Sequence, residues 1–299
     1  MQPLRRILLR DNAITIGFAP EWGGALTRFD VCVGNKLIDL LRPAIDDPVG
    51  PIHALGSSCF PLVPYGGRLR NGRFRFAGKT FQYPLNAVPE RHSSHGDGWT
   101  RSWSLIHLDR RSAIMALSVD ESAPLKYQCT QSITVNGNRV RIALIARNCD
   151  TNPIPIGLGL HPYFANRAEA TITAVLPAHR RWDQELMPTT YERNLLSNSF
   201  RRGRSVVDLP VAAEYAEWDG RAVIDWPASG VRLDLITTPR LEHVVMWLPV
   251  SKEFFCFEPI SHATDAFNTN HNPTSGADFA VIEPRGSLEQ CFDFTISIY

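Results

Sequence analysis

The chain is organised around the stretch Ile154-Pro155-Ile156-Gly157-Leu158-Gly159-Leu160-His161-Pro162-Tyr163-Phe164. An apolar run of strand length, thinned by two glycines, leads to a histidine, and a proline and two aromatic residues follow at once. Glycine within a strand often marks the close approach of another backbone, and proline cannot continue a hydrogen-bonded ladder. The pattern predicts a strand that ends at His161 and carries its imidazole to the rim of an aromatic-walled cleft. It also fits a core strand with one hydrogen-bonded histidine, because histidine can serve either purpose.

Short runs with a period of two residues continue on both sides of this stretch. The turn dipeptides Asp11-Asn12, Ala77-Gly78 and Asn136-Gly137 each join two such runs, which predicts three β-hairpins. Residues 34–57 contain three prolines and are expected to form a loop. No segment keeps an apolar period of 3.6 residues, and open sheets rarely exceed about ten strands. The sequence therefore predicts an all-β protein, a large antiparallel β-sandwich that forms one domain over residues 1–299.

The composition excludes several classes of partner. Of 299 residues, 31 are basic and 30 acidic, so neither nucleic acid nor an anionic membrane is expected as a partner. No window approaches the roughly 18 apolar residues of a membrane span, and residues 1–10 lack the apolar region of a signal peptide. The six cysteines are scattered without a Cys-x-x-Cys pair, which indicates reduced thiols rather than disulfides or a zinc site. We therefore expect a cytoplasmic protein, either a monomer or a homodimer.

Two loop clusters carry residues suited to binding. In Pro64-Tyr65-Gly66-Gly67-Arg68, two glycines precede an arginine, which predicts a turn that presents the planar donors of Arg68 to fixed oxygens. A solvated basic hairpin, continuing to Arg70 and Arg73, is the alternative. In Arg91-His92-Ser93-Ser94-His95-Gly96, two histidines lie three residues apart, but no third metal ligand follows at a convincing spacing. We expect His95 to hydrogen-bond the hydroxyl groups of a ligand.

A third cluster places a carboxyl group among aromatic residues. The apolar run Phe254-Phe255-Cys256-Phe257 leads to Glu258, and Pro259 follows. Burial raises the pKa of a carboxyl group toward the value that a general base needs at neutral pH. Exposure at a strand end, without function, is the alternative. Because His161 and Glu258 each end an apolar strand and each precede a proline, they are a candidate acid/base pair.

In their order and spacing, these pieces resemble the aldose 1-epimerase (galactose mutarotase) family over most of the chain. The matching pieces are the turn from Pro20 to Gly23-Gly24, Arg68 with Asn71-Gly72-Arg73-Phe74, His95-Gly96, residues 159–164, and Phe257-Glu258-Pro259 running on to Asp265-Ala266-Phe267-Asn268. The fold of that family is one large antiparallel β-sandwich, in agreement with the strand pattern.

The resemblance implies a role for each matched residue. His161 corresponds to the general acid that protonates the ring oxygen of a sugar. Glu258 corresponds to the general base that takes the proton from the anomeric hydroxyl. Arg68 and His95 correspond to residues that hydrogen-bond sugar hydroxyls.

One match to the family fails. The family usually carries a substrate-binding aspartate a few residues before the equivalent of Trp218-Asp219-Gly220, where this chain has Ala212-Ala213-Glu214-Tyr215. The departure leaves the identity of the sugar open, while the acid and the base are both present.

The expected activity is the interconversion of the α and β anomers of a hexose by ring opening and reclosure. The partner is a small-molecule sugar, and no metal or other cofactor is needed. One alternative is a hexose-6-phosphate 1-epimerase, with its phosphate bound by Arg70, by Arg73 or by the loop Arg201-Arg202-Arg204. Another is a non-catalytic carbohydrate-binding protein of the same fold. A lyase or glycosidase would need paired carboxylates flanking a bond, and the sequence offers one well-placed carboxylate.

Overall fold

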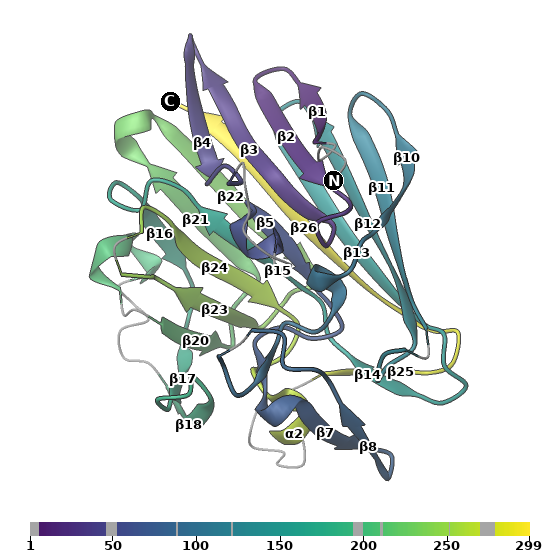
Figure 1. Ribbon diagram of the computed structural model, residues 1–299. Coiled ribbons are helices and arrows are strands. Elements are labelled where there is room, and N and C mark those ends of the chain that lie inside the picture. Colours follow the sequence, from purple (N-terminus) through teal and green to yellow (C-terminus); the bar gives the residue numbers. More distant parts are fainter. Residues whose placement is uncertain are drawn as a thin grey trace.

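Two large antiparallel sheets, one of eleven strands and one of nine, face each other (Figure 1). The computed structural model describes residues 6–45, 53–87, 89–120, 122–193, 200–209, 212–250, 252–269 and 279–299. Two prolines of the expected loop, at positions 48 and 51, lie outside these ranges. The predicted all-β sandwich is confirmed.

The first sheet contains the strands that carry the candidate catalytic residues. Its strands, in spatial order, are β1 (Ile7–Asp11), β2 (Ile14–Ala19), β3 (Ala25–Val33), β4 (Lys36–Leu41), β15 (Gly159–Phe164), β24 (Phe255–Ile260), β23 (His243–Trp247), β20 (Ala212–Ala216), β17 (Ala178–Trp182) and β18 (Pro188–Arg193), with β5 (Cys59–Leu62) paired to β15 and β3.

The second sheet covers one face of the first. Its strands, in spatial order, are β10 (Ser104–Leu108), β11 (Ser112–Val119), β12 (Tyr127–Asn136), β13 (Arg139–Asn148), β26 (Ser287–Ile298), β22 (Val231–Thr238), β21 (Arg221–Trp226), β16 (Thr171–Ala174) and β19 (Arg204–Ser205).

Short elements cover the ends of the sandwich. Three strand pairs are β14 (Ile154–Ile156) with β25 (Ala280–Ile282), β6 (Arg68–Leu69) with β9 (Ser93–Ser94), and β7 (Arg73–Phe76) with β8 (Lys79–Gln82). The helical turns are η1 (His53–Gly56), η2 (Arg70–Gly72), η3 (Gly98–Thr100), η4 (Val206–Asp208), η5 (Pro227–Ser229) and α2 (Ala266–Thr269). No helix in the described part of the chain has the length and apolar content to cross a bilayer.

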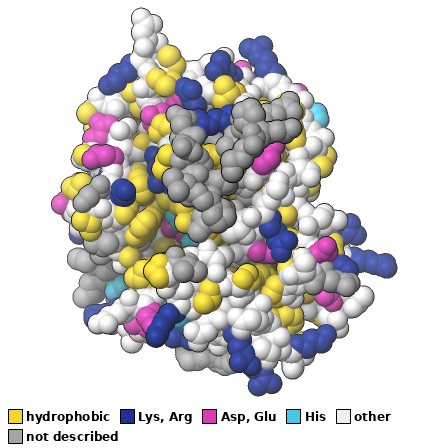
Figure 2. All heavy atoms as spheres, in the orientation of Figure 1, with side chains coloured by type: hydrophobic (Ala, Val, Ile, Leu, Met, Phe, Trp, Pro, Cys, Tyr) yellow, Lys and Arg dark blue, Asp and Glu magenta, His cyan; other side chains and the backbone are white. Residues whose placement is uncertain are grey.

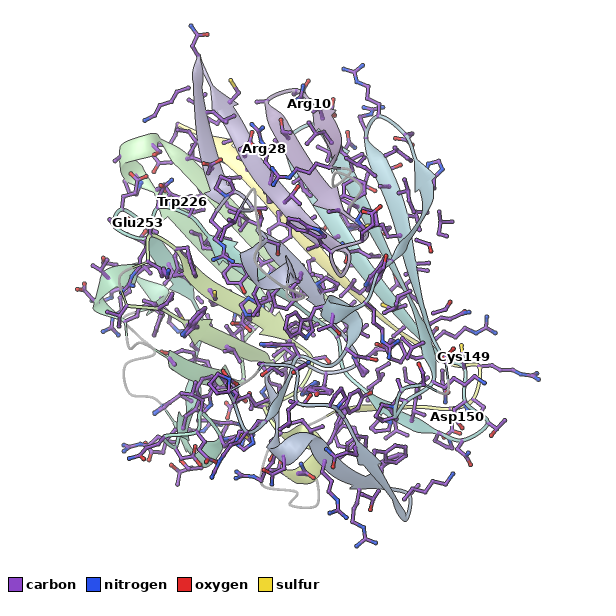
Figure 3. All side chains as sticks on the ribbon, viewed as in Figure 1. Arg10, Arg28, Cys149, Asp150, Trp226 and Glu253 are labelled. Carbon is purple, nitrogen blue, oxygen red and sulfur yellow. The ribbon has the colours of Figure 1, made fainter. Side chains whose placement is uncertain are left out.

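The main hydrophobic core fills the space between the two sheets. Across it, Phe29 of β3 meets Phe294 of β26 edge to face, with ring centroids 5.8 Å apart. The indole N–H of Trp226, on β21, donates to the carbonyl of Ala165 directly after β15 (Figure 3). All six cysteines are free, as expected, and Cys149 lies with Asp150 just beyond the end of β13 (Figure 3). This core fixes the inner face of the first sheet and leaves the other face for chemistry.

The three predicted hairpins are confirmed. Asp11-Asn12, Ala77-Gly78 and Asn136-Gly137 join β1 to β2, β7 to β8 and β12 to β13. Asn12, Ala77 and Gly78 have positive φ angles, as turns of this kind require.

The expected loop over residues 34–57 is wrong in part, because β4 occupies Lys36–Leu41. This strand ends before the first of the three prolines, Pro43, and the apolar side chains at its C-terminal end are buried. The prolines indicate the irregular part of the segment and say nothing about the six residues that precede it.

The prediction that strands end at His161 and Glu258 is also wrong. His161 is the third residue of β15 and Glu258 the fourth residue of β24, and both strands continue through the following proline. Pro162 pairs with Cys59, the first residue of β5, and at Phe164 the partner is β4 instead. The N–H of Tyr163 donates to the carbonyl of Ser58 on the β5 side, so the missing N–H of Pro162 would face β24 instead. Proline is tolerated here because β15 pairs with β24 at Gly159, Tyr163 and Phe164 and not at position 162.

Candidate active site

The candidate catalytic residues lie in a row that crosses the first sheet. The register of β15 against β24 places His161 opposite Glu258. Glu258 opposes Val245 of β23, Val245 opposes Glu214 of β20, and Glu214 opposes Arg180 of β17. Directly opposed residues of antiparallel strands point to the same face. These five residues, which we call the transverse row, therefore share one face of the sheet.

That face is the one turned away from the main core. Leu160 and Phe257, the neighbours of the acid/base pair along their strands, belong to the core between the sheets. Phe60, Tyr163 and Cys256 belong to a second, smaller cluster. Since side chains alternate across a strand, the transverse row lies with the second cluster. In Figure 2 a hollow opens on this side of the molecule, with hydrophobic side chains gathered around it.

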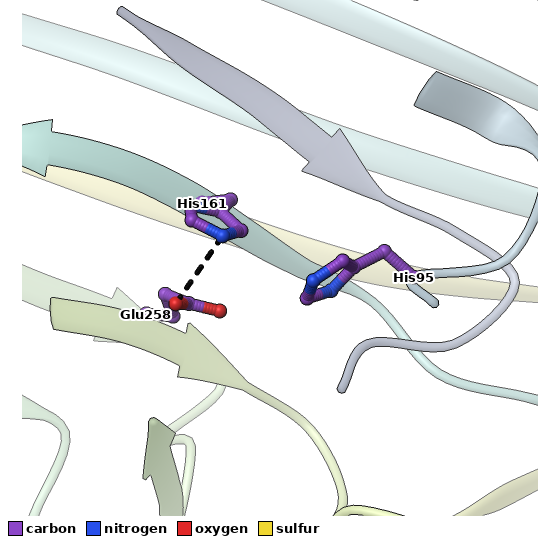
Figure 4. Close-up of side chains that lie close together, drawn as sticks. All are labelled: His95, His161 and Glu258. Atoms are coloured by element: carbon purple, nitrogen blue, oxygen red, sulfur yellow. Dashed lines mark ion pairs between the residues drawn. The ribbon is translucent and has the colours of Figure 1, made fainter. Parts of the chain in front are cut away.

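The two candidate catalytic groups are in direct contact (Figure 4). Nε2 of His161 lies 3.3 Å from Oε1 of Glu258. His161 is 4% exposed and Glu258 is 2% exposed, so both are withdrawn from bulk water. The imidazole packs against two rings, Phe60 and Tyr163, each with its centroid 4.6 Å away, and these two rings also contact each other at 6.2 Å. This packing fixes the plane of the imidazole.

Burial sets the protonation of the pair. It raises the pKa of Glu258 to about 8, against an opposing effect of the positive charge of Arg68. It lowers the pKa of His161 well below 6.5, and the neighbouring His95 and Arg42 lower this pKa further. At neutral pH the pair therefore holds one proton. Moving that proton across the 3.3 Å contact converts a neutral pair into a carboxylate and an imidazolium.

His95 completes the group as a hydrogen-bond donor (Figure 4). Its Nδ1 accepts the backbone N–H of Gly67 at 3.1 Å, so the ring proton lies on Nε2. His95 has a φ of +58°, a backbone conformation that residues other than glycine rarely adopt and that often marks functional sites. Burial, followed by the charge of Arg68, lowers the pKa of His95, which keeps the ring neutral.

The same three residues resemble a metal site in composition. His95, His161 and Glu258 each offer a ligand atom within 4.8 Å of the other two, and two imidazoles with a carboxylate form a donor set that several metals accept. A metal, however, needs the unprotonated nitrogen, and the Nδ1 of His95 is engaged by Gly67. The N–H that remains suits an oxygen acceptor better than a cation.

Arg68 is positioned by a carboxylate that the sequence analysis did not single out. Its guanidinium makes a two-pronged ion pair with Glu90, at 2.9 Å for each contact. Gly67, directly before it, has a φ of +66° and packs against Thr264, which explains the glycine turn. Arg68 also lowers the pKa of Glu258, which places its charge beside the acid/base pair.

The chain that forms this site matches a known protein family. The family model described as aldose 1-epimerase matches residues 5–284. The chain belongs to the aldose 1-epimerase family.

Individual relatives of this aldose 1-epimerase family member span most of its length. The uncharacterized protein YphB of Escherichia coli K12 is 28% identical over 256 residues, which cover 82% of this chain and 84% of YphB. The aldose 1-epimerase of the same organism is 27% identical over 176 residues, which cover 54% of this chain and 48% of that protein. Among solved structures, a candidate aldose 1-epimerase from E. coli K12 shares the fold with a TM-score of 0.87, at 24% identity and with coverage of 99% and 100%.

The structure brings together the four residues that the family resemblance singled out. His161, Glu258 and His95 form one cluster, and Arg68 lies beside it. His92, the second histidine of the same loop, is directed elsewhere, because its Nε2 contacts Glu185 at 3.2 Å.

The segment 212–215, where the sequence analysis found no match to the family's aspartate, contributes Glu214 to the transverse row. Glu214 is fully buried, and its Oε1 lies 3.3 Å from Nε of Arg180. Both carboxylate oxygens also accept the backbone N–H of Thr264 at 3.2 Å. The carboxylate of Glu214 is thus committed to groups of the protein itself.

Several contributors to the site gave no usable signal in the sequence of this aldose 1-epimerase family member. Glu90, Phe60 and Arg42 come from three different loops and strands, and each acts through a partner distant in the chain. Tyr163 lay inside the quoted stretch but was read as a cleft wall, without its stacking on His161. Only the packing of the sheet assigns these residues to the site.

Proposed function

We propose that this chain is an aldose 1-epimerase that interconverts the α and β anomers of a sugar by general acid/base catalysis. The 3.3 Å contact between His161 and Glu258 on one face of the sheet is the observation that carries the proposal. Two proton-transfer groups at this separation can reach two oxygens bonded to one carbon, as in a cyclic hemiacetal.

The reaction uses the single proton that the pair holds. Glu258, as the carboxylate, takes the proton of the anomeric hydroxyl, while the bond between C1 and the ring oxygen breaks. The bonding electrons pass to the ring oxygen, which receives the proton of the His161 imidazolium. Rotation about C1–C2 turns the free aldehyde, and the reverse transfers close the ring as the other anomer. Acid/base catalysis of this kind contributes about 10²–10⁴-fold.

His95 and Arg68 bind the sugar in this proposal. The Nε2–H of His95 donates to a hydroxyl oxygen, and the guanidinium of Arg68, fixed by Glu90, donates to another. A polar side chain that is already held by another protein group orients a ligand better than a mobile one, because it loses less conformational freedom on binding.

Polarimetry of freshly dissolved α-D-glucose or α-D-galactose with the purified chain tests the proposal. We expect accelerated equilibration, and a loss of about two orders of magnitude or more with His161→Ala or with Glu258→Gln. The matched control is His179→Ala, because Nε2 of His179 also faces a glutamate, Glu192, at 3.8 Å on the neighbouring strands β17 and β18. This control should keep the wild-type rate.

The same experiment distinguishes an epimerase from a non-catalytic carbohydrate-binding protein of the same fold. Binding of sugar in a calorimeter without any acceleration of anomer exchange would identify a carbohydrate-binding protein instead. Wild-type activity that survives both His161→Ala and Glu258→Gln would remove the proposed acid and base.

A further inference from the structure

One side chain, that of Asn86, holds the backbone on both sides of His95. Nδ2 of Asn86 donates to the carbonyl of Ser94 and to the carbonyl of Gly96, each at 2.8 Å. Its Oδ1 accepts the N–H of Ser94 at 2.7 Å. An asparagine amide offers two donor hydrogens and one acceptor oxygen, so these three bonds engage both of its ends. We call them the Asn86 clamp.

The clamp encloses a turn that most residues adopt only under constraint. His95 has a φ of +58° and Gly96 a φ of +69°, so two successive residues lie in the left-handed region. A residue other than glycine stays in that region only where its surroundings fix it there. The clamp fixes peptide groups just before and just after the turn, and the N–H of His95 donates to the carbonyl of Gly67 at 2.8 Å.

The direction of the His95 ring follows from this backbone. Nδ1 of the ring accepts the N–H of Gly67 at 3.1 Å, and the ring lies edge to face with that of His161, with centroids 5.1 Å apart. In Figure 4 the ring points toward His161 and Glu258. A rotation of the backbone at position 95 would break the contact with Gly67 and turn the ring away from the acid/base pair.

The segment between β8 and β9 supplies the groups that hold both proposed sugar-binding residues. Asn86 holds the turn at His95, and Glu90, four residues further on, holds the guanidinium of Arg68. Arg68 of β6 also pairs with Ser94 of β9. The two sugar-binding residues and the two residues that hold them therefore form one connected unit.

We propose that Asn86 is a positioning residue for sugar binding, which acts through His95 by fixing the turn that aims this imidazole at the acid/base pair. The inference rests on the proposed function, in which the Nε2–H of His95 donates to a hydroxyl of the sugar. Asn86 itself touches no reacting atom in this assignment. Without the clamp, His95 has to be ordered at each binding event, and that loss of conformational freedom weakens binding.

Asn148 provides a matched control in the second sheet. It is the last residue of β13, and its Nδ2 donates to the carbonyls of Asn152 and Ile282 at 2.9 and 2.8 Å. Its Oδ1 accepts the N–H of Asp150 at 2.7 Å. Asn148→Ala therefore removes the same three kinds of hydrogen bond as Asn86→Ala, but outside the site.

A double-mutant cycle on anomer exchange tests whether Asn86 acts through His95. We expect Asn86→Ala to lower kcat/KM by roughly tenfold, the value of one hydrogen bond. Asn148→Ala should leave kcat/KM unchanged at a temperature where both variants remain folded. In a His95→Ala background, Asn86→Ala should change kcat/KM by less than about twofold, because residues that act in series share one loss.

Two comparisons separate positioning from general stability. Asn86→Ala and His95→Ala should divide their losses between KM and kcat in the same way, because each removes the same contact with the sugar. Asn86→Asp keeps an acceptor for the N–H of Ser94 but has no hydrogen to donate to the two carbonyls. It should lower kcat/KM at least as much as Asn86→Ala.

The tautomer of His95 gives a readout that does not depend on catalysis. With nitrogen-15-labelled histidine, NMR of the wild type should show an unprotonated Nδ1 and a protonated Nε2 for His95, and His95→Ala identifies these signals by their loss. In Asn86→Ala the two shifts should move toward each other, because a ring released from Gly67 exchanges between tautomers. In Asn148→Ala they should stay in place.

Each failure has a separate meaning. A loss of more than about twofold on adding Asn86→Ala to His95→Ala would overturn the proposal, because Asn86 would then act on another part of the site. Equal losses with Asn86→Ala and Asn148→Ala, or nitrogen shifts of His95 that do not move in Asn86→Ala, would overturn it as well. No anomer exchange by the wild type would overturn the proposed function instead, and the nitrogen shifts would still decide whether Asn86 orients His95.

Discussion

The His161–Glu258 pair illustrates how burial alone can prepare two residues for proton transfer. An isolated glutamate and histidine in water would hold no proton and a partial one near neutral pH. In the sheet, the carboxyl group of Glu258 keeps its proton up to about pH 8. The imidazolium of His161 loses its proton at a pH well below 6.5. The pair thus holds one proton over a wide range of pH. A reversible exchange of anomers needs a pair that shares one proton, because one group must give a proton while the other takes one.

The rate of anomer exchange should therefore follow the proton count of the pair. We expect kcat/KM to be constant around neutral pH and to fall as the pH rises through about 8, where Glu258 loses its proton and the pair holds none. It should also fall at a pH well below 6.5, where His161 takes up a second proton. With ordinary pKa values the basic limb would begin near 6.5 instead. Polarimetric rates corrected for buffer catalysis measure the profile, and a basic limb near 6.5 contradicts the pKa assigned to Glu258.

The same carboxyl group should make folding stability depend on pH. Its pKa is raised from 4.5 in the unfolded chain to about 8 in the folded one, so the folded state holds the proton more tightly. The resulting stability is fully present below about pH 4.5 and is lost as the pH rises toward 8, by on the order of a few kcal/mol. Glu258→Gln cannot lose a proton, so its melting temperature should gain on that of the wild type between pH 5 and pH 9. A constant difference across that range would show that Glu258 titrates normally.

Strands and turns differ in how much of them the sequence reveals. The hairpin turns and the alternating strands were predicted correctly because their signals are local, as at Ala77-Gly78 and Asn136-Gly137. The continuation of β15 past Pro162 was missed because it depends on which strand lies alongside. The candidate residues His161 and Glu258 were recognised by their setting and by family resemblance. Their contact follows from the register of β15 against β24, and a register between distant strands leaves no mark in either segment.

The loop that carries His95 needs glycine at position 96, because a side chain there would collide with the neighbouring backbone. Gly96 has a φ of +69°, and a Cβ there would lie 2.5 Å from the carbonyl oxygen of Val63 and 2.8 Å from the nitrogen of Pro64. Because these are backbone atoms, they cannot move aside cheaply. Gly96→Ala should displace His95, lower kcat/KM and lower the free energy of unfolding by more than the about 1–2 kcal/mol of a left-handed backbone alone.

Gly34 provides the matched control for this loop. It has a similar φ of +59°, and beyond its chain neighbours no atom of the described residues lies within 4 Å of the Cβ that a substitution would add. Gly34→Ala should therefore carry the backbone cost alone and leave kcat/KM unchanged. Chemical denaturation and polarimetry measure both quantities, and equal effects of the two substitutions on activity would contradict the steric role of Gly96.

Over the whole molecule, the first sheet divides stability and chemistry between its two faces. The inner face packs on the second sheet and forms the main core, while the outer face carries the transverse row and its aromatic cluster. Polar groups that are buried and partly unsatisfied are destabilising, as Glu258 illustrates through its raised pKa. A large core on the opposite side can offset that cost without touching the site. The faces should therefore respond differently to the loss of an aromatic ring.

Phe294 and Phe60 are fully buried rings on opposite sides of the first sheet. Phe294 packs on Phe29 between the sheets, and Phe60 packs on His161 in the site. Phe294→Ala should reduce the free energy of unfolding by about 3–5 kcal/mol yet leave kcat/KM unchanged at a temperature where the variant remains folded. Phe60→Leu should lower kcat/KM, because the imidazole loses one of the two rings that fix its plane. Urea denaturation and anomer-exchange rates on both variants measure the contrast. If Phe294→Ala lowered the activity of the folded molecule as much as Phe60→Leu, the two faces would be coupled through the sheet, and the core could not be treated as a separate support for the site.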